Sequence, residues 1–214
     1  MTVADLDDAS RARGWAGALG ELRAAVQFRI FRHGEVLVIE QDLERVGSPE
    51  PPEGVEIRIC NSEVDWAALT SIANRRTRDR FRRASARGRI CLAAWRGERP
   101  VGYTWLSARM DPDLETFPLP LPDDGLYGWD LYVDPAERRF GIGSALTSAR
   151  LSHAKALGHR VGWRAIDIDN RGSVGTVRNT AGDGVRIVGR FRYVKIFGWI
   201  RGRMLPSELD SPIE

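Results

Sequence analysis

The sequence predicts an α+β fold, with strands and helices packed around one core. Three observations support this class. Apolar runs with β-branched or alternating residues mark strands along the chain, and segments with apolar residues at helical spacing separate them. The Gly97-Glu98-Arg99 turn separates two adjacent strand-like runs and indicates an antiparallel hairpin. Residues 127–157 join a strand to a helix through a glycine-bearing loop.

Length and composition are those of one globular domain. The 214 residues are 43% hydrophobic and 29% charged, which allows a sizeable core and excludes a collagen-like or disordered chain. The formal net charge is +3, and nearly all basic residues are arginine. No apolar run approaches the roughly 20 residues of a membrane helix, and the first eight residues are acidic. We therefore expect a cytoplasmic protein without a membrane partner.

Cysteine and histidine give no sign of a metal site. Cys60 and Cys91 are the only cysteines and lack Cys-x-x-Cys spacing, and the three histidines are scattered. Neither a disulfide framework, nor a metal centre, nor a Ser-His-Asp triad is expected. Both cysteines are predicted to pack as small apolar residues in strands.

Residues 1–54 are predicted to form an N-terminal extension. An apolar stripe at helical spacing predicts a helix up to about Val26, docked on the core or, alternatively, available to a membrane surface or a partner. Two apolar runs that flank His33-Gly34 predict a β-hairpin over 26–39. A proline-rich linker follows at 47–54. The main domain is expected over 55–201, with 202–214 as a C-terminal tail.

The main domain is predicted to alternate strands and helices. Strands are expected at 55–60, 89–95, 100–110, 127–133, 160–168, 185–189 and 192–199, and helices at 61–72, 75–83, 144–157 and 172–180. Asn61 or Ser62 is the predicted N-cap of the first helix. The second helix is rich in arginine and could bind phosphates, but no nucleic-acid-binding motif accompanies it. A solvated helix face is therefore favoured over a nucleic-acid partner.

The loop Arg138-Arg139-Phe140-Gly141-Ile142-Gly143 is the most informative segment. It follows a strand that Asp134-Pro135 ends, and it precedes a helix. A helix that begins at such a loop directs unpaired N–H groups and the positive end of its dipole toward the space before it. The spacing matches neither a Rossmann nor a Walker loop. It predicts a site for a nucleotide-like anion, although a plain strand-to-helix turn would also use glycine.

Arg138-x-x-Gly141-x-Gly143, with Leu131-Tyr132-Val133-Asp134-Pro135 before it, resembles the CoA-binding segment of the GNAT superfamily of acyl-CoA-dependent N-acyltransferases. The resemblance covers about residues 55–200. It implies three layers, with helices flanking a mixed, mostly antiparallel central sheet. It implies acetyl-CoA or another acyl-CoA as cosubstrate and an amine of a small molecule or a protein as acceptor, and it leaves a homodimer open. The cofactor-binding residues that it implies are Leu131, Val133, Arg138, Arg139, Gly141, Ile142, Gly143, Ser144 and Asn170.

Asp130 is the candidate general base, because similar enzymes often carry a carboxylate or a water-binding group in this strand. An exposed carboxylate at a sheet edge is the alternative. Strand alternation predicts that Asp130 and Tyr132 lie on one face and that Trp129 and Leu131 lie on the other. Only one of these two sets can face a cleft.

The general acid is less clear from the sequence. The family often places a tyrosine on the helix after Asn170, where this chain has Val177. Tyr132, Tyr103 or water could protonate the departing thiolate, and Asn170 could be only an N-cap. The leading hypothesis is an N-acetyltransferase. The alternative is a catalytically inactive binding or regulatory protein of the same fold that retains CoA.

The connection at 111–124 is long for a hairpin, and long loops in compact domains are often functional. Its five acidic residues would attract a cationic amine, and its prolines would limit its flexibility. A solvated, variable loop is the alternative interpretation.

Overall fold

A computed structural model describes residues 31–45, 50–72, 75–111, 115, 117–167, 170, 173, 184–197 and 199–206. The described strands form one sheet of eight, in the order β2-β3-β4-β5-β6-β1-β7-β8. Its neighbours are antiparallel except for the parallel pair β5 and β6. The strands are β1 (Phe31–Asp42), β2 (Glu56–Cys60), β3 (Ile90–Arg96), β4 (Arg99–Ser107), β5 (Gly125–Val133), β6 (Val161–Asp167), β7 (Val185–Ile196) and β8 (Trp199–Pro206). The helices are α2 (Glu63–Leu69), α3 (Arg75–Ala86) and α4 (Ile142–Ala156), with short 3-10 turns η1 (Leu43–Arg45) and η2 (Pro135–Glu137).

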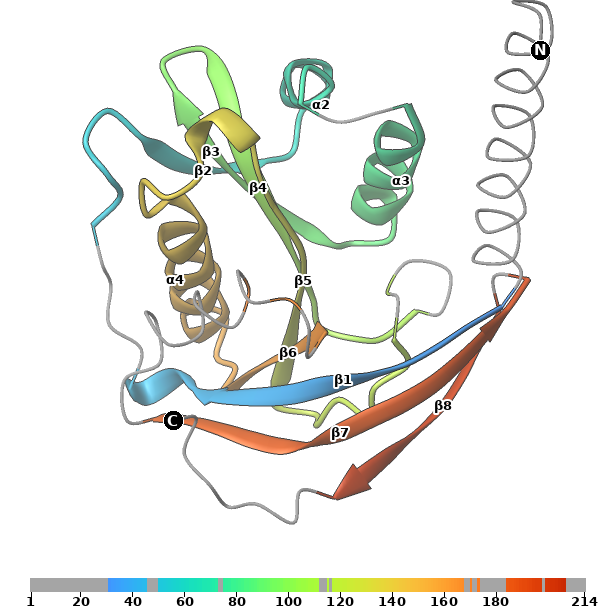
Figure 1. Ribbon diagram of the computed structural model, residues 1–214. Coiled ribbons are helices and arrows are strands. Elements are labelled where there is room, and N and C mark those ends of the chain that lie inside the picture. Colours follow the sequence, from blue (N-terminus) through green and yellow to red (C-terminus); the bar gives the residue numbers. More distant parts are fainter. Residues whose placement is uncertain are drawn as a thin grey trace, which may run out of the picture.

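Helices cover both faces of the part of the sheet formed by β3, β4 and β5. α4 lies on one face, and α2 and α3 lie on the other (Figure 1). Residues of β4 after Arg99 are buried without alternation, as expected for a strand that is covered on both sides. Ala94 packs with Leu146 on the α4 side, whereas Trp95 packs with Trp66 on the α2 side. The predicted α+β class, with a mixed, mostly antiparallel sheet between helices, is confirmed.

The first two helices follow the sequence prediction. Ser62 caps α2, because its hydroxyl accepts the Asp65 N–H at 3.2 Å while Asp65 Oδ2 accepts the Ser62 N–H at 3.3 Å. α2 ends at Leu69 rather than at Ile72. The arginine-rich segment forms α3 as expected. None of the helices in the described segments is long and apolar enough to cross a bilayer.

The predicted hairpin at His33-Gly34 is wrong. β1 runs straight through these residues and pairs with β7 on one side and β6 on the other. In this register Gly34 lies opposite Tyr193, and a Cβ on Gly34 would lie 2.8 Å from the Tyr193 hydroxyl oxygen. Glycine therefore makes room for a tyrosine ring rather than turning the chain. The predicted N-terminal helix lies outside the described residues.

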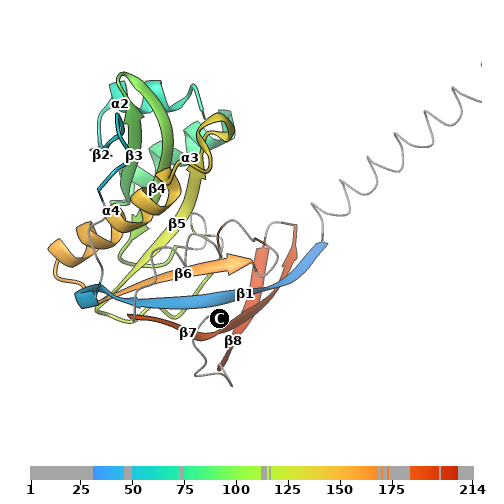
Figure 2. The ribbon, with the colours of Figure 1, turned by 60° about the vertical axis from the view of Figure 1, so that its left-hand side comes forward.

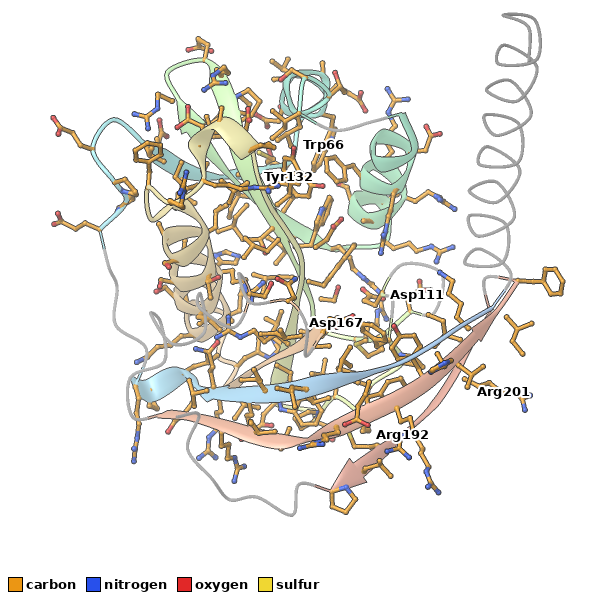
Figure 3. The ribbon with its side chains drawn as sticks, viewed as in Figure 1. Trp66, Asp111, Tyr132, Asp167, Arg192 and Arg201 are labelled. Carbon is orange, nitrogen blue, oxygen red and sulfur yellow. The ribbon has the colours of Figure 1, made fainter. Side chains whose placement is uncertain are left out.

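The end of the chain also differs from the prediction. The two strands expected at 185–189 and 192–199 are one strand, β7, and the last turn comes at Phe197, where φ is +47°. β8 then continues to Pro206 at the edge of the sheet. The outer face of this hairpin carries arginines, among them Arg192 and Arg201 (Figure 3), and Glu35 of β1 accepts a hydrogen bond from Arg192 Nη2 at 3.2 Å.

β5 and β6 separate soon after they begin. Their parallel pairing covers only Gly125–Tyr127 with Val161–Trp163. β5 then continues to Val133 while β6 turns away (Figure 2). In the described part of the chain, the second half of β5 is thus paired on its β4 side alone. This leaves a strand edge open where the backbone leads into η2 and α4.

Candidate functional site

A β-bulge interrupts β5 at Asp130. The pairing of β4 with β5 shifts between Tyr103 and Trp105, so that two residues of β5 lie opposite one residue of β4. Asp130 has φ +50°, in the left-handed region that few residues other than glycine, asparagine and aspartate adopt readily. Bulges and such backbone conformations are concentrated near functional sites.

The bulge changes which side chains share a face. Trp129 stacks on Trp105 with ring centroids 5.6 Å apart, and Tyr132 stacks on Tyr103 at 5.5 Å. Leu131 packs instead with the cluster on the α4 side. The predicted alternation is therefore wrong for Trp129, which lies on the same face as Tyr132, because the extra residue in the bulge reverses the alternation of the strand.

Asp130 faces α3 rather than open solvent at a sheet edge. Burial raises the pKa of its carboxyl group, and the positive charge of Arg80 on α3 partly opposes this shift. The Arg80 guanidinium also lies 5.0 Å from the centroid of the Trp129 ring. Tyr103 is buried, and its pKa is raised first by burial and then by the charge of Asp130. A half-buried carboxylate next to a phenol is a suitable general base.

The segment between β5 and α4 is tied to the β3–β4 hairpin. Asp134 Oδ1 accepts the Ala136 N–H at 3.0 Å and fixes the start of η2. Glu137 is buried and accepts hydrogen bonds from Arg96, at 3.2 Å, and from Arg99. These two arginines stand on either side of the Gly97-Glu98 turn. The ion pairs therefore hold the loop against a rigid hairpin.

Within the described residues, the first turn of α4 offers N–H groups without a hydrogen-bond partner. α4 begins at Ile142 after Gly141, which has φ +82° and provides no side-chain cap. The first backbone bond of the helix runs from the Ala145 N–H to the Gly141 carbonyl at 3.0 Å, so the N–H groups of Ile142, Gly143 and Ser144 lie ahead of it. Gly141 is exposed, while Gly143 and Ser144 are half-buried. This geometry suits an anion.

Two arginines flank these N–H groups. Arg138 is exposed, and its Nε donates a hydrogen bond to the Val133 carbonyl at 3.1 Å. Arg139 is also exposed and has φ +71°, which turns the chain toward α4 together with Gly141. The structure thus brings together most of the residues predicted to bind the cofactor, from Leu131 to Ser144, along one continuous segment.

Asn170 makes the contact of the alternative that the sequence left open for it. Its side-chain oxygen accepts the Ser173 N–H at 3.0 Å, which is the contact of an N-cap. Its contact with a cofactor stays a prediction. Val177, the position at which the family often has tyrosine, lies outside the described residues.

In its described residues, the acidic connection is not a free cluster of carboxylates. Glu115 is fully buried and accepts a hydrogen bond from Arg89 Nε at 2.9 Å. Asp111 accepts one from Arg87 at 2.6 Å. Asp123 and Asp124 precede the first residue of β5, at the opposite end of this strand from the loop that leads into the first turn of α4. Attraction of a cationic amine by the whole loop is therefore not supported by this arrangement.

The cysteines pack as predicted. Cys60 of β2 and Cys91 of β3 lie opposite each other, buried and as free thiols. Among the described residues, no group of three or more His, Cys, Asp or Glu side chains is arranged to hold a metal ion. Sequence reasoning missed Arg80, because a single functional arginine has no distinguishing signal within an arginine-rich helix.

Comparison with known proteins adds a family assignment. The model of the acetyltransferase (GNAT) family matches residues 57–181, which is more than half of the chain. The comparison with curated proteins found no match.

Similar solved structures include three proteins of this fold. A GCN5-related N-acetyltransferase from Kribbella flavida is 15% identical, with a TM-score of 0.51 over 78% of this chain and 60% of that chain. A GCN5-related N-acetyltransferase from Sphaerobacter thermophilus is 15% identical, with a TM-score of 0.52 over 89% and 58%. A tandem GNAT protein from the clavulanic acid biosynthesis pathway is 16% identical, with a TM-score of 0.54 over 86% and 58%. The chain thus spans 58–60% of the length of these structures, and the likeness shows the fold.

Proposed function

Because this chain belongs to the acetyltransferase (GNAT) family, we propose that it transfers an acetyl group from acetyl-CoA to an amine. The observation that supports this most is the continuity of one segment. The open edge of β5, with the bulge at Asp130, leads directly through the tied loop to the exposed N-terminus of α4. The pantetheine arm would lie along Leu131 and Val133. The pyrophosphate would lie at Gly141–Ser144, beside Arg138.

The acceptor amine must lose a proton before or during its attack. Asp130 would accept this proton, directly or through a water molecule, as the nitrogen forms a bond to the thioester carbonyl carbon. The C–S bond then breaks, and the thiolate takes a proton from a donor. Tyr132 is the proposed donor, because it is half-buried beside Asp130, whereas Tyr103 is almost fully buried. The raised pKa of the Asp130 carboxyl favours its role as a base near neutral pH.

A catalytically inactive protein that binds CoA is the second candidate. The features that favour cofactor binding are all in the described segment from Leu131 to Ser144, whereas the sequence has Val177 where the family often has a tyrosine. Binding and catalysis must therefore be tested separately.

Binding is tested by thermal unfolding. Acetyl-CoA at about 100 times its Kd should stabilise the protein by roughly 2.7 kcal/mol and raise Tm, and Gly141→Glu should abolish this rise. The glutamate places a negative charge at the anion site. Gly158→Glu is the control, because Gly158 has a similar φ of +87°, open space around it, and a position at the other end of α4. No Tm rise for the unmodified protein at millimolar acetyl-CoA would contradict both candidate functions.

Catalysis is tested by thiol release from acetyl-CoA over a panel of amines. Transferase activity predicts release with at least one amine, and Asp130→Asn should lower kcat/KM by about 10²- to 10⁴-fold, the usual contribution of a general base. A Tm rise with acetyl-CoA but no thiol release for any amine would favour the inactive binding protein.

A further inference from the structure

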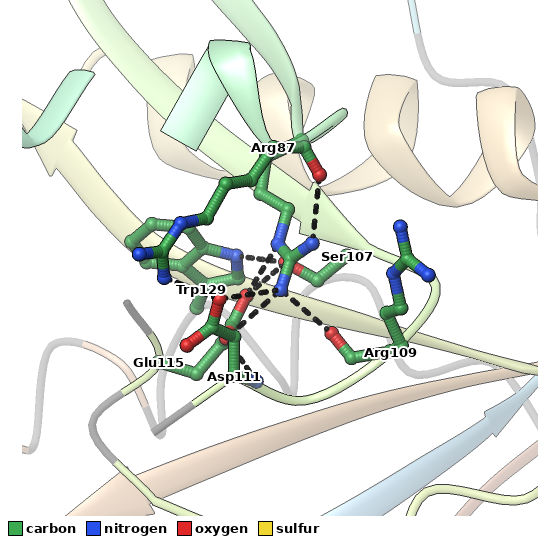
Figure 4. A network of polar contacts seen from close by, with 7 residues as sticks. Arg87, Ser107, Arg109, Asp111, Glu115 and Trp129 are labelled. Atoms are coloured by element: carbon green, nitrogen blue, oxygen red, sulfur yellow. Dashed lines mark hydrogen bonds and ion pairs between the residues drawn. The ribbon is translucent and has the colours of Figure 1, made fainter. Parts of the chain in front are cut away.

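A series of buried, hydrogen-bonded polar side chains links the loop at 111–124 to the bulge at Asp130 (Figure 4). At its centre is Glu115, whose side chain is 0% exposed. Its carboxylate accepts hydrogen bonds from Arg89 Nε at 2.9 Å and from the Asp111 backbone N–H at 2.6 Å. It also accepts a short hydrogen bond from the Ser107 hydroxyl. Arg89 is itself 4% exposed and donates to the Arg87 and Arg109 carbonyls at 2.9 and 3.1 Å.

The direction of the hydrogen bonds among these side chains follows from which groups can donate and which can accept. The indole N–H of Trp129 can only donate, so the Ser107 oxygen accepts from it, at 2.7 Å. The single proton of the Ser107 hydroxyl is then available for the Glu115 carboxylate alone. An ionised carboxylate fixes the orientation of the hydroxyl, and the hydroxyl fixes the edge of the indole.

The indole is held on its faces as well. Trp105 stacks on it with centroids 5.6 Å apart, and the Arg80 guanidinium lies 5.0 Å from its centroid. Trp129 is the residue before Asp130, which has the left-handed backbone of the bulge. Arg80 is the cation that acts on the Asp130 carboxyl group. A displacement of the indole would therefore move Arg80 relative to Asp130.

We infer that Glu115 is a positioning residue of the proposed acetyltransferase: through Ser107 it holds the Trp129 indole, and with it Arg80 and the Asp130 bulge, in place. The inference rests on the proposed function for its catalytic meaning. Glu115 acts through other side chains and does not touch the reacting atoms. A buried ion pair contributes little net stability, so Arg89 and Glu115 alone do not explain this arrangement.

The charged and titratable groups around Asp130 define what a measurement should detect. Among the described residues, those that interact electrostatically with its carboxyl group are Arg80 on α3, Tyr103 on β4 and Cys91 on β3. Tyr132, two residues further along β5, stacks on Tyr103. Of these, Arg80 is the cation, and it favours the ionised carboxylate. If Ser107 no longer holds the indole, Arg80 becomes less well placed, and the carboxyl group should titrate at higher pH.

The experiment measures the titration of the Asp130 carboxyl carbon by ¹³C NMR in the full chain, with the signal assigned by its loss in Asp130→Asn. The Ser107→Ala and Trp129→Phe variants should each shift the titration midpoint upward, and the double variant should shift it no further than the larger single effect. Arg80→Gln sets the largest shift to be expected. Ser107→Thr, which keeps the hydroxyl, should retain the original midpoint.

Three outcomes are distinguished, and the first separates positioning from a structural role. Ile39→Val is the control for mild destabilisation of the core at a site outside these hydrogen-bonded side chains. Ile39 is 1% exposed, and the change costs about 0.5–1.5 kcal/mol. If Ser107→Ala lowers Tm as Ile39→Val does but leaves the Asp130 midpoint unchanged, the inference is overturned. If the midpoint shifts but no amine supports thiol release, the positioning stands and the proposed acetyltransferase activity fails. If the midpoint shifts and at least one amine supports thiol release, the low-pH limb of the pH profile of kcat/KM should shift by the same amount as the midpoint.

Discussion

Asp130 combines two features that each cost free energy. Its backbone lies in the left-handed region, and its carboxyl group is half-buried, so that its charge is partly desolvated. A residue selected for stability alone would avoid both, since glycine or asparagine fits the same backbone without a charge. Both costs are consistent with the catalytic role that we propose for Asp130.

Asp130→Asn should stabilise the protein at pH 7 while it lowers the proposed transferase activity. The pKa of the Asp130 carboxyl is higher in the folded than in the unfolded chain, so the folded state holds its proton to higher pH. Its contribution to the unfolding free energy is most favourable at low pH and falls as pH rises from the unfolded value of 3.8 through the folded value. Asparagine lacks this penalty and tolerates the left-handed backbone.

The measurement is Tm from pH 3 to 8 for the unmodified protein and for the Asp130→Asn variant. The advantage of the variant should appear at neutral pH and disappear toward pH 3, where both the folded and the unfolded state hold the proton. Asp123→Asn, at an exposed aspartate, is the control and should show little difference at any pH. A lower Tm for Asp130→Asn at pH 7 would mean that the ionised carboxylate is stabilising, contrary to this account.

At the scale of elements, the site depends on how a strand, a loop and a helix are fixed to one another. α4 packs on β3, β4 and β5, while η2 is fastened to the β3–β4 hairpin through Glu137. The Glu137 carboxylate is 11% exposed, whereas its two arginine partners are 41% and 52% exposed. The loop before α4 is thereby set before any ligand arrives, which reduces the entropy lost on binding.

Glu137→Gln should lower the unfolding free energy by about 1–2 kcal/mol, because it replaces a charged acceptor of two arginines with a neutral amide. It should also weaken acetyl-CoA binding, since the loop would need to be ordered by the ligand. Urea unfolding and calorimetric titration measure the two effects. Glu44→Gln is the matched control: its pair with Lys155 is exposed and should be worth less than about 1 kcal/mol. Equal effects of the two substitutions would show that the Glu137 pairs do not fix the loop.

Local signals in the sequence predict the elements whose causes are local. Asp134-Pro135 ends β5, Ser62 caps α2, and the glycine loop precedes α4, each as the sequence indicates. The role of Gly34 depends on Tyr193, which is distant in the chain, and the same glycine is also typical of a turn. The hairpin prediction therefore has a sound local reason that a long-range contact overrides.

The candidate site likewise has features that the sequence predicts and features that it does not. The anion loop could be predicted from residues close together in the sequence, and so could the identity of Asp130. The bulge could not, because aspartate in the left-handed region leaves no pattern in a strand of aromatic and branched residues. The burial of Glu115 depends on Arg89, and the effect of Arg80 depends on the packing of α3 against the sheet. Both depend on tertiary contacts between segments that are distant in the sequence.

At the scale of the whole molecule, β1 joins the two halves of the sheet. It lies between β6 and β7 and pairs with both, so these two strands do not meet each other. Val36 and Val38 of β1 are fully buried and belong to the large core cluster that also contains Trp105 and Trp129. We propose that the folding unit begins at β1 rather than at residue 55.

Deletion of residues 1–54 should therefore prevent cooperative folding. The remaining chain keeps β2 to β8, but β6 and β7 lose their shared neighbour, and each exposes an unpaired edge beside apolar core residues. We expect a broad thermal transition, weak near-UV circular dichroism and aggregation, because open edges pair between molecules. Coexpression of residues 1–54 as a separate fragment is the control, and it should restore a sharp transition by supplying β1. If the fragment 55–214 alone unfolds cooperatively with a native near-UV spectrum, the boundary at residue 54 separates an independent domain, and β1 is an addition to a sheet that is stable without it.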